Sequence, residues 1–118
     1  MKKIGLLPCS GACNLGMTTT KSVINVLNKK ENTDFVCALG LPLGIEGIIK
    51  NGKSSHSYIA VNGCKVKCAS KALQSADIEV NEEIVLTEDY SIKKNKNYND
   101  ETKLEDIENQ LENLVDSL

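Results

Sequence analysis

Tyr58-Ile-Ala-Val-Asn-Gly-Cys-Lys-Val-Lys-Cys68 is an apolar run that breaks at an Asn-Gly pair and is followed by two cysteines. The run predicts a buried strand, and Gly63 lets the backbone leave that strand at an angle that other residues resist. If a helix begins directly after Gly63, Cys64 and Cys68 lie four residues apart on one helix face, where they can share one metal ion or form one disulfide. The unpaired N–H groups of the first helical turn favour a negative charge, so Cys64 is expected to ionise more easily than a free thiol.

Similar units of strand, loop and helix precede this stretch, and one more strand follows it. Apolar runs predict strands at residues 3–7, 34–38, 58–61 and 84–87. Apolar positions at helical spacing predict helices that begin at the threonines 18–20, near residue 45 and after residue 63. Alternating strands and helices imply parallel strands with right-handed crossovers. We therefore expect an α/β fold, a small Rossmann-like or flavodoxin-like three-layer domain with about four parallel strands in the order 2-1-3-4.

The C-terminal part of the chain has a different character. Residues 1–94 are predicted to form a single α/β domain that carries the cysteines, and residues 95–118 an acidic linker and helix. Thr102-Lys-Leu-Glu105 matches a capping box, and apolar residues then recur at spacings of three and four. This pattern predicts an amphipathic helix docked on its own domain. The alternative is a homodimer through this helix, although two heptads are too few for a stable free coiled coil.

Charge is distributed unevenly over the 118 residues. Residues 1–76 carry ten lysines and three acidic residues, a net charge of +7, whereas residues 77–118 carry four lysines and thirteen acidic residues, a net charge of −9. We expect the two parts to attract each other. The chain has no arginine, and aromatic residues make up only 3% of it. This combination argues against nucleic-acid binding and against phosphoryl transfer that depends on an arginine clamp.

The location of the protein follows from what the sequence lacks. No apolar stretch is long enough to span a bilayer, and the first residues do not form the apolar region of a signal peptide. These features predict a cytosolic protein that does not associate with membranes. Because the cytosol is reducing, its five cysteines favour metal binding or thiol chemistry over a disulfide framework.

The positions of the cysteines are the strongest functional signal. Cys9, Cys37 and Cys64 each stand at or just past the carboxyl end of a predicted strand, where open α/β sheets bind ligands, and Cys68 follows one helical turn later. Four thiolates suit tetrahedral Zn²⁺, and helix amino ends or nearby lysines could offset the excess negative charge. Any single cysteine, Cys37 above all, could instead fill the core. His56 precedes the third strand, at the opposite edge of the sheet, and is expected at the surface.

Four stretches of the chain resemble DGC-domain proteins, a family named for an Asp-Gly-Cys motif and proposed to bind zinc. They are Leu7-Pro-Cys-Ser-Gly11, Cys37-Ala-Leu-Gly40, Asn62-Gly-Cys-Lys-Val-Lys-Cys-Ala-Ser-Lys-Ala-Leu73, and Val85-Leu-Thr87 with Ile92-Lys-Lys94, which together cover about residues 4–94. The third stretch is quite specific. The resemblance implies a small α/β domain whose zinc ligands correspond to Cys9, Cys37, Cys64 and Cys68.

Two positions depart from the pattern of that family. Asn62 stands where the motif has Asp, which puts in question any role of that carboxylate as a hydrogen-bond acceptor behind the metal ligands or as a base. Cys13 stands where close relatives have serine. It could serve as a fifth thiol near the ion, as a replacement ligand or as a resolving thiol in a redox reaction.

Three functions are compatible with these residues. The leading hypothesis is a cytosolic zinc-binding protein whose ion is held by Cys9, Cys37, Cys64 and Cys68, in a closed site if all four bind or in an open site if water replaces Cys37. The alternative is a thiol oxidoreductase or redox sensor, with Cys64 as nucleophile and Cys68 or Cys13 as resolving thiol. A third hypothesis is an interaction module that works through the acidic C-terminal helix. Zinc is one of several metals that suit this donor set, since thiolates also accept Cu(I), iron or an iron–sulfur cluster.

Overall fold

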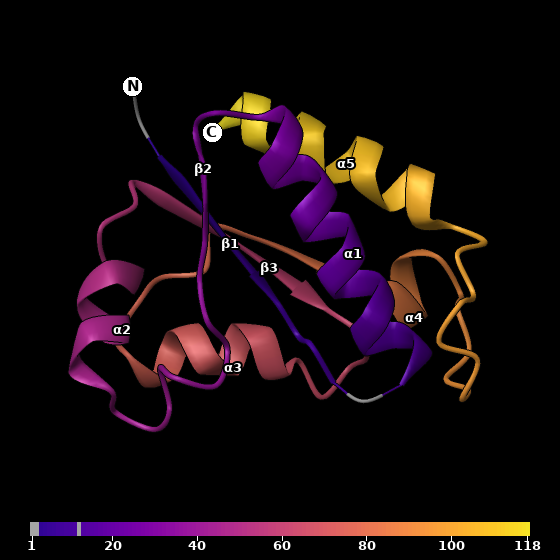
Figure 1. Ribbon diagram of the computed structural model, residues 1–118, viewed down its shortest axis with the longest axis horizontal. Coiled ribbons are helices and arrows are strands. Elements are labelled where there is room, and N and C mark those ends of the chain that lie inside the picture. The colour runs from indigo at the N-terminus through magenta and orange to yellow at the C-terminus, as the bar shows by residue number, and fades with distance from the viewer. Residues whose placement is uncertain (1–2, 12) are drawn as a thin grey trace.

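A parallel sheet of four strands forms the middle of the protein (Figure 1), in a computed structural model that describes residues 3–11 and 13–118. The strands are β1 (Ile4–Pro8), β2 (Thr33–Phe35), β3 (Ser57–Asn62) and β4 (Glu82–Val85). Their order is β2-β1-β3-β4, and each neighbouring pair is parallel, which confirms the predicted topology. Residues 1 and 2 of the predicted domain and residue 12 of its first loop lie outside the described part.

Helices cover both faces of the sheet. One face carries α1 (Asn14–Lys29) and α5 (Leu104–Ser117), and the other carries α2 (Glu46–Gly52) and α3 (Cys68–Ser75), while α4 (Leu86–Asp89) is a single turn after β4. Strands β1 and β3 are buried along their whole length, as central parallel strands covered on both sides should be. The predicted three-layer arrangement is confirmed. Among residues 3–11 and 13–118, no helix is long and apolar enough to cross a membrane.

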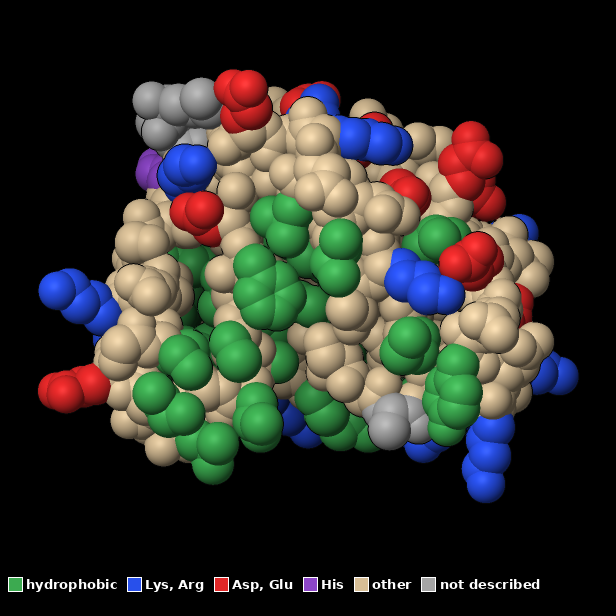
Figure 2. Space-filling view, in the orientation of Figure 1, with side chains coloured by type: hydrophobic (Ala, Val, Ile, Leu, Met, Phe, Trp, Pro, Cys, Tyr) green, Lys and Arg blue, Asp and Glu red, His purple; other side chains and the backbone are tan. Residues whose placement is uncertain are grey.

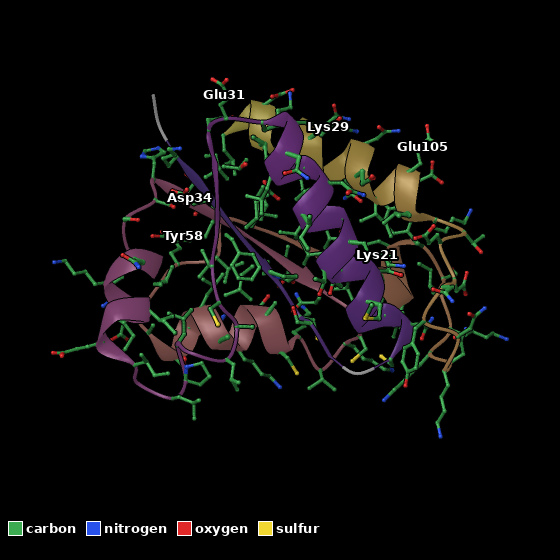
Figure 3. All side chains as sticks on the ribbon, viewed as in Figure 1. Lys21, Lys29, Glu31, Asp34, Tyr58 and Glu105 are labelled. Carbon is green, nitrogen blue, oxygen red and sulfur yellow. The ribbon has the colours of Figure 1, made fainter. Side chains whose placement is uncertain are left out.

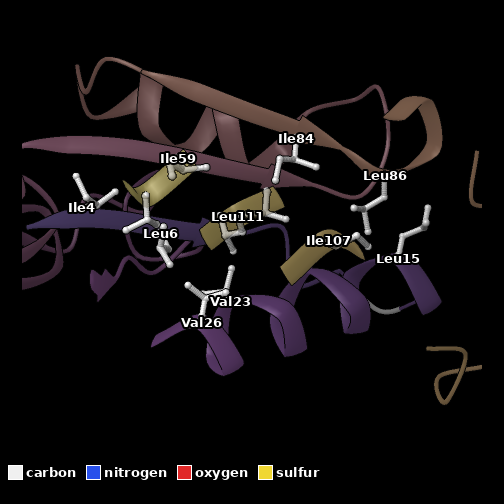
Figure 4. Packing of buried hydrophobic residues seen from close by; sticks show 12 residues of the cluster. Ile4, Leu6, Leu15, Val23, Val26, Ile59, Ile84, Leu86, Ile107 and Leu111 are labelled. Carbon is white, nitrogen blue, oxygen red and sulfur yellow. The ribbon is translucent and has the colours of Figure 1, made fainter. Parts of the chain in front are cut away.

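Helix α5 is part of the core of the domain (Figure 4). Ile107, Leu111 and Val115 of α5 are at most 1% exposed and belong to the same apolar cluster as Val23 and Val26 of α1. The predicted docking of this helix on its own domain is confirmed. A homodimer through α5 stays a prediction, and the buried side of the helix is already occupied within the chain.

Ion pairs join the basic and acidic parts of the chain. In the part of the chain that the structure describes, all four pairs link a lysine before residue 76 to an acidic residue after it: Lys21–Glu101 (2.9 Å), Lys29–Glu112 (3.5 Å), Lys30–Asp116 (3.0 Å) and Lys67–Glu83 (2.7 Å). Figure 3 shows Lys21 and Lys29 on α1, beside the acidic α5. The expected attraction is confirmed, although an exposed pair contributes only about 0.2–1 kcal/mol.

The start of α1 differs from the prediction. The helix begins at Asn14 and not at the threonines, because the hydroxyls of Thr19 and Thr20 donate to the carbonyl of Gly16 (2.8 and 3.0 Å) from inside the helix. These side chains therefore bond within the first turns of α1 and do not cap its end. The consequence is a short loop between β1 and α1, with Cys9 near its beginning and Cys13 at its end.

Two further boundaries near the C-terminal part were predicted wrongly. Residues 86–89 form α4 and do not extend β4, since the carboxylate of Asp89 accepts a hydrogen bond from the N–H of Val85 (2.9 Å) and closes the turn. The capping box at residues 102–105 is also absent. The hydroxyl of Thr102 donates to the carboxylate of Asp100 (2.6 Å), and α5 starts at Leu104 without a side-chain cap.

Candidate functional site

The loop after β1 places Cys9 beside β3. The N–H of Cys9 donates to the carbonyl of Val61 (2.9 Å), which extends the pairing of β1 with β3 by one residue. Ser10 then adopts a left-handed conformation (φ 57°), and its N–H and hydroxyl contact the hydroxyls of Thr19 and Thr20 (3.3 and 3.0 Å). The loop is therefore held against the first turns of α1, and Cys9 is held with it.

Gly16 allows the same loop to lie directly on α1. A Cβ atom at Gly16 would stand 1.8 Å from the carbonyl oxygen of Gly11, far inside any real contact distance. Because that oxygen belongs to the backbone, no side-chain rotation could relieve the overlap. The close approach of the loop to α1 therefore requires glycine at this position of the helix.

Asn62, at the end of β3, organises the segment that carries the other two thiols. Its side chain is fully buried, and its Oδ1 accepts hydrogen bonds from the N–H groups of Ala69 (3.0 Å) and Ser70 (3.2 Å) in the first turn of α3. Its Nδ2 donates to the hydroxyl of Ser70 (2.9 Å). Asn62 therefore satisfies two of the unpaired N–H groups at the start of α3, as an N-cap side chain does.

The network continues from Ser70 to the surface. The Ser70 hydroxyl donates to one carboxylate oxygen of Glu83 (2.8 Å), and the ammonium group of Lys67 donates to the other (2.7 Å). Hydrogen bonds from Lys67 and then Ser70 lower the pKa of Glu83, while partial burial opposes them. From the sequence, Lys67 was considered only as one of the lysines that could offset the charge of the thiolates, and no role was expected for Ser70 or Glu83. Nothing in their spacing indicates that β4 brings Glu83 to the start of α3.

The predicted helix after Gly63 begins four residues later than expected. Residues 64–67 form a turn, Lys67 adopts a left-handed conformation (φ 58°), and α3 starts at Cys68. The physical reason is the cap: Asn62 bonds the N–H groups of Ala69 and Ser70, so the first helical turn is placed there. Cys64 and Cys68 do not share a helix face, and the predicted effect of a helix end on Cys64 loses its basis.

Three of the four predicted ligands nevertheless influence one another electrostatically. Burial raises the pKa of the Cys68 thiol, and the nearby thiols of Cys9 and Cys64 raise it further, with a hydrogen bond to Cys9 acting in the same direction. The positive charge of Lys71 has the opposite effect. Cys68 is an exposed residue, so its loss of hydration is partial. The ends of β1 and β3 and the start of α3 therefore bring three thiols into one electrostatic neighbourhood.

Cys37 reaches the same region through a cavity. Since β2 ends at Phe35, Cys37 lies just past its carboxyl end, as predicted, in the segment that joins β2 to α2. It lines a cavity of about 580 Å³ together with Cys9 and Cys68. Figure 2 shows apolar side chains gathered on this side of the molecule, over β2 and the segment that follows it. Cys37 is half-buried and faces this cavity, so it is not simply a core filler.

Cys13 and Cys64 also pack on the other side of the sheet. Both contact the apolar cluster between the sheet and the helices α1 and α5. Cys13 is the residue directly before α1 and does not line the cavity that holds Cys9, Cys37 and Cys68. His56 is exposed ahead of β3, as expected.

The four cysteines are chemically suited to bind a thiophilic metal, but their sulfur atoms are not positioned around one point. Within residues 3–11 and 13–118, no group of three or more His, Cys, Asp or Glu side chains is disposed to hold a metal ion. A cysteine sulfur moves by rotation about a single bond between staggered positions. Such rotations would be needed to bring the sulfurs of Cys9, Cys64 and Cys68 to one point, with Cys37 approaching from the cavity.

Comparison with known protein families gives a match to the DGC domain over residues 5–114. The chain belongs to the DGC-domain family. The match includes α5 up to Leu114, consistent with the place of that helix in the core. Comparisons with curated proteins and with solved structures gave no match.

In this DGC domain, the position of the motif's Asp has a structural role. Asn62 accepts two backbone hydrogen bonds at the start of α3, which an aspartate could also accept. An aspartate could not make the third bond, in which the amide donates to Ser70. The departure from the family motif therefore preserves the cap and changes only the contact with Ser70.

Proposed function

We propose that this DGC domain is a cytosolic zinc-binding protein in which Cys9, Cys64 and Cys68 hold the ion and Cys37 completes the site from the cavity wall. The observation that carries the proposal is that Cys9, Cys37 and Cys68, which come from segments far apart in the sequence, line one cavity, with Cys64 close enough for its charge to affect that of Cys68. Bound zinc would stabilise these groups as thiolates and so offset the burial and the mutual repulsion that raise the pKa of Cys68. Lys71 and the amino end of α3 supply positive charge on the same side.

Zinc content of the purified protein tests this proposal. We expect about one zinc per chain after anaerobic purification, and four thiols that become reactive when a chelator removes it. Cys9→Ser, Cys64→Ser and Cys68→Ser should each lose the metal. Cys37→Ser distinguishes a closed site, which loses zinc, from an open site, in which Cys37 is not a ligand and zinc is retained. Cys13→Ser is the matched control and should keep its zinc. Unchanged zinc in Cys64→Ser, or none in the unmodified protein, would reject the assignment.

The second candidate function is thiol–disulfide exchange, and the placing of Cys9 and Cys68 on the wall of the same cavity favours it. In this reaction the thiolate of one cysteine attacks a disulfide substrate, which gives a mixed disulfide and releases the first substrate thiol. The second cysteine then attacks the mixed disulfide and releases the second substrate thiol. One S–S bond forms in the protein, and the substrate is reduced to two thiols. The sequence placed Cys64 as the nucleophile, with Cys68 or Cys13 resolving; the structure adds Cys9 as a partner for Cys68.

Oxidised glutathione provides the test of exchange. After incubation of metal-free protein with this disulfide, peptide mapping by mass spectrometry should find a bond from Cys68 to Cys9 or Cys64, with two hydrogen atoms lost. A protein that forms only mixed disulfides with glutathione, or none, is not an exchange catalyst. Because the zinc test and this test use different readouts, each candidate can fail independently.

A further inference from the structure

The cavity beside the thiols has room for more than a metal ion. Its volume of about 580 Å³ lies within the range of small-molecule sites, roughly 300–1,000 Å³. Apart from the cysteines, its walls are formed mainly by Phe35, Leu39, Pro42 and Ala72. This cavity therefore has the size and the lining of a small-molecule site.

The apolar walls of this cavity are unusually accessible. Phe35, the only phenylalanine of the chain, is 52% exposed, and Leu39 is 68% exposed. Large apolar side chains left in water forgo the stabilisation that burial would give, roughly 25 cal/mol per Å². A ligand with an apolar body would recover part of it. Its contact surface would be the ring of Phe35 and the side chains of Leu39 and Pro42.

One charged side chain lines the cavity, the ammonium group of Lys71. The four ion pairs found among the described residues use other lysines, so Lys71 has no acidic partner there. A single lysine supplies one positive charge, which one carboxylate neutralises, whereas a multiply charged phosphate would leave negative charge unpaired beside the apolar wall. The position of Lys71 on α3, one turn after Cys68, places that charge beside the thiols.

We propose that this cavity binds a small organic acid whose apolar body lies against Phe35, Leu39 and Pro42 and whose carboxylate pairs with Lys71. The bound molecule then lies next to Cys9 and Cys68, the thiols that the cavity shares with the proposed metal site. The proposal rests on the cavity, its lining and Lys71, and it holds whether or not a metal is bound.

Phenylbutyrate, which joins an aromatic body to one carboxylate, is a suitable probe. Titration into ¹⁵N-labelled protein should shift the amide signals of residues that line the cavity, in a saturable way. Phenylbutyramide has the same shape without the charge and should bind about fivefold more weakly, the size expected for one partly exposed ion pair. Equal affinity for the two probes, or shifts that centre elsewhere on the molecule, would overturn the proposal.

Two pairs of variants separate the site from general effects of charge. Lys71→Gln should weaken phenylbutyrate binding about fivefold and leave phenylbutyramide binding unchanged, whereas Lys65→Gln, at an exposed lysine outside the cavity, should alter neither.

Leu39→Asp should weaken binding of both probes by more than about tenfold, because it places a charge on the apolar wall. Leu43→Asp is its control, since Leu43 is similarly exposed (64%) and does not line the cavity. Equal effects within either pair would contradict the assignment.

A third variant separates this proposal from that of the zinc site. Cys64 is a proposed ligand but does not line the cavity. Cys64→Ser should therefore lose zinc and still bind phenylbutyrate within about twofold of the unmodified protein. If the unmodified protein holds zinc and the probe fails to bind to it, the cavity proposal is wrong and the zinc proposal stands. If Cys64→Ser keeps its zinc and binds the probe, the ligand assignment is wrong and the cavity proposal stands.

Discussion

Asn62 and Ser70 are joined by two hydrogen bonds, one in each direction. The Oδ1 of Asn62 accepts from the backbone N–H of Ser70 (3.2 Å), and its Nδ2 donates to the Ser70 hydroxyl (2.9 Å). Both residues are buried, at 0% and 3% exposure. The pair ties the end of β3 to the first turn of α3 and so fixes the turn that contains Cys64 and leads to Cys68.

Removal of this link should destabilise the protein clearly. Asn62→Ala loses the cap and leaves buried N–H groups unpaired, so we expect a loss of about 2–3 kcal/mol in the free energy of unfolding. Urea denaturation followed by circular dichroism measures it. Asn113→Ala, at an exposed asparagine of α5, is the control and should change stability by less than about 0.5 kcal/mol. A similar small change in Asn62→Ala would mean that the cap contributes little.

Restoration of the family's aspartate should have a smaller effect that depends on Glu83. In Asn62→Asp both backbone hydrogen bonds survive, but two carboxylates then compete for the single hydrogen of the Ser70 hydroxyl. We expect a loss of about 1 kcal/mol near neutral pH, most of which is recovered in the double variant with Glu83→Gln. Additive losses in the double variant would show that the two carboxylates do not interact.

The ion pair between Lys67 and Glu83 should make stability depend on pH in acid. Because the pKa of Glu83 is lowered in the folded state, by Lys67 first and then by Ser70, its contribution is present above the ordinary carboxyl pKa. It is lost as the pH falls through the lowered value. Side-chain exposures of 40% and 37% limit the contribution to less than about 1 kcal/mol.

Unfolding free energies of the unmodified protein and Glu83→Gln test this dependence. The difference between them should be largest near neutral pH and should disappear in acid, below the lowered pKa of Glu83. Glu83 is the main cause of the raised pKa of Lys67, and the smaller effects of Glu88 and Asp89 are present in both proteins, so the difference between the two isolates Glu83. A difference between the two proteins that is constant with pH would show that Glu83 acts without its charge.

Two glycines in helices should respond in opposite ways to alanine. Gly16→Ala forces a Cβ atom against the carbonyl oxygen of Gly11, so we expect a loss of about 2–3 kcal/mol and displacement of the loop that holds Cys9. Gly47 of α2 has nothing within 4 Å of its would-be Cβ, and Gly47→Ala should stabilise by about 0.5–1 kcal/mol through helix propensity. Thermal unfolding of the two variants measures the change in stability, which should be negative for Gly16→Ala and positive for Gly47→Ala. A stabilised Gly16→Ala would show that the loop does not lie on α1.

Helix α5 should be indispensable for folding. Leu111 is fully buried between α5, α1 and the sheet, so Leu111→Ala should cost about 2–5 kcal/mol. Leu43→Ala, at a leucine that is 64% exposed, should be nearly neutral. Deletion of residues 99–118 would expose the same cluster, so it cannot serve as a test of an interaction role for the tail. Wild-type stability of Leu111→Ala would place α5 outside the core.

The amino-acid sequence by itself determined the architecture of this protein. Period and composition predicted the parallel sheet, because short apolar runs alternate with helices that have one apolar face, and the strand order expected from the common order of such sheets was correct. The spacing of Ile107 and Leu111 likewise predicted the docked C-terminal helix. Uneven charge predicted the ion pairs between the two parts of the chain. These features are local or statistical, so they can be read without coordinates.

Only the tertiary structure decided where α3 begins and which thiols meet. Asn62 moves the start of that helix from Cys64 to Cys68 by bonding backbone groups seven and eight residues away, a contact that helix propensity does not contain. Cys37 lies outside β2, which ends at Phe35, and it lines the cavity that also contains Cys9 and Cys68. Both outcomes depend on contacts between segments distant in sequence, and such contacts exist only after the sheet has brought the carboxyl ends of its strands to one edge.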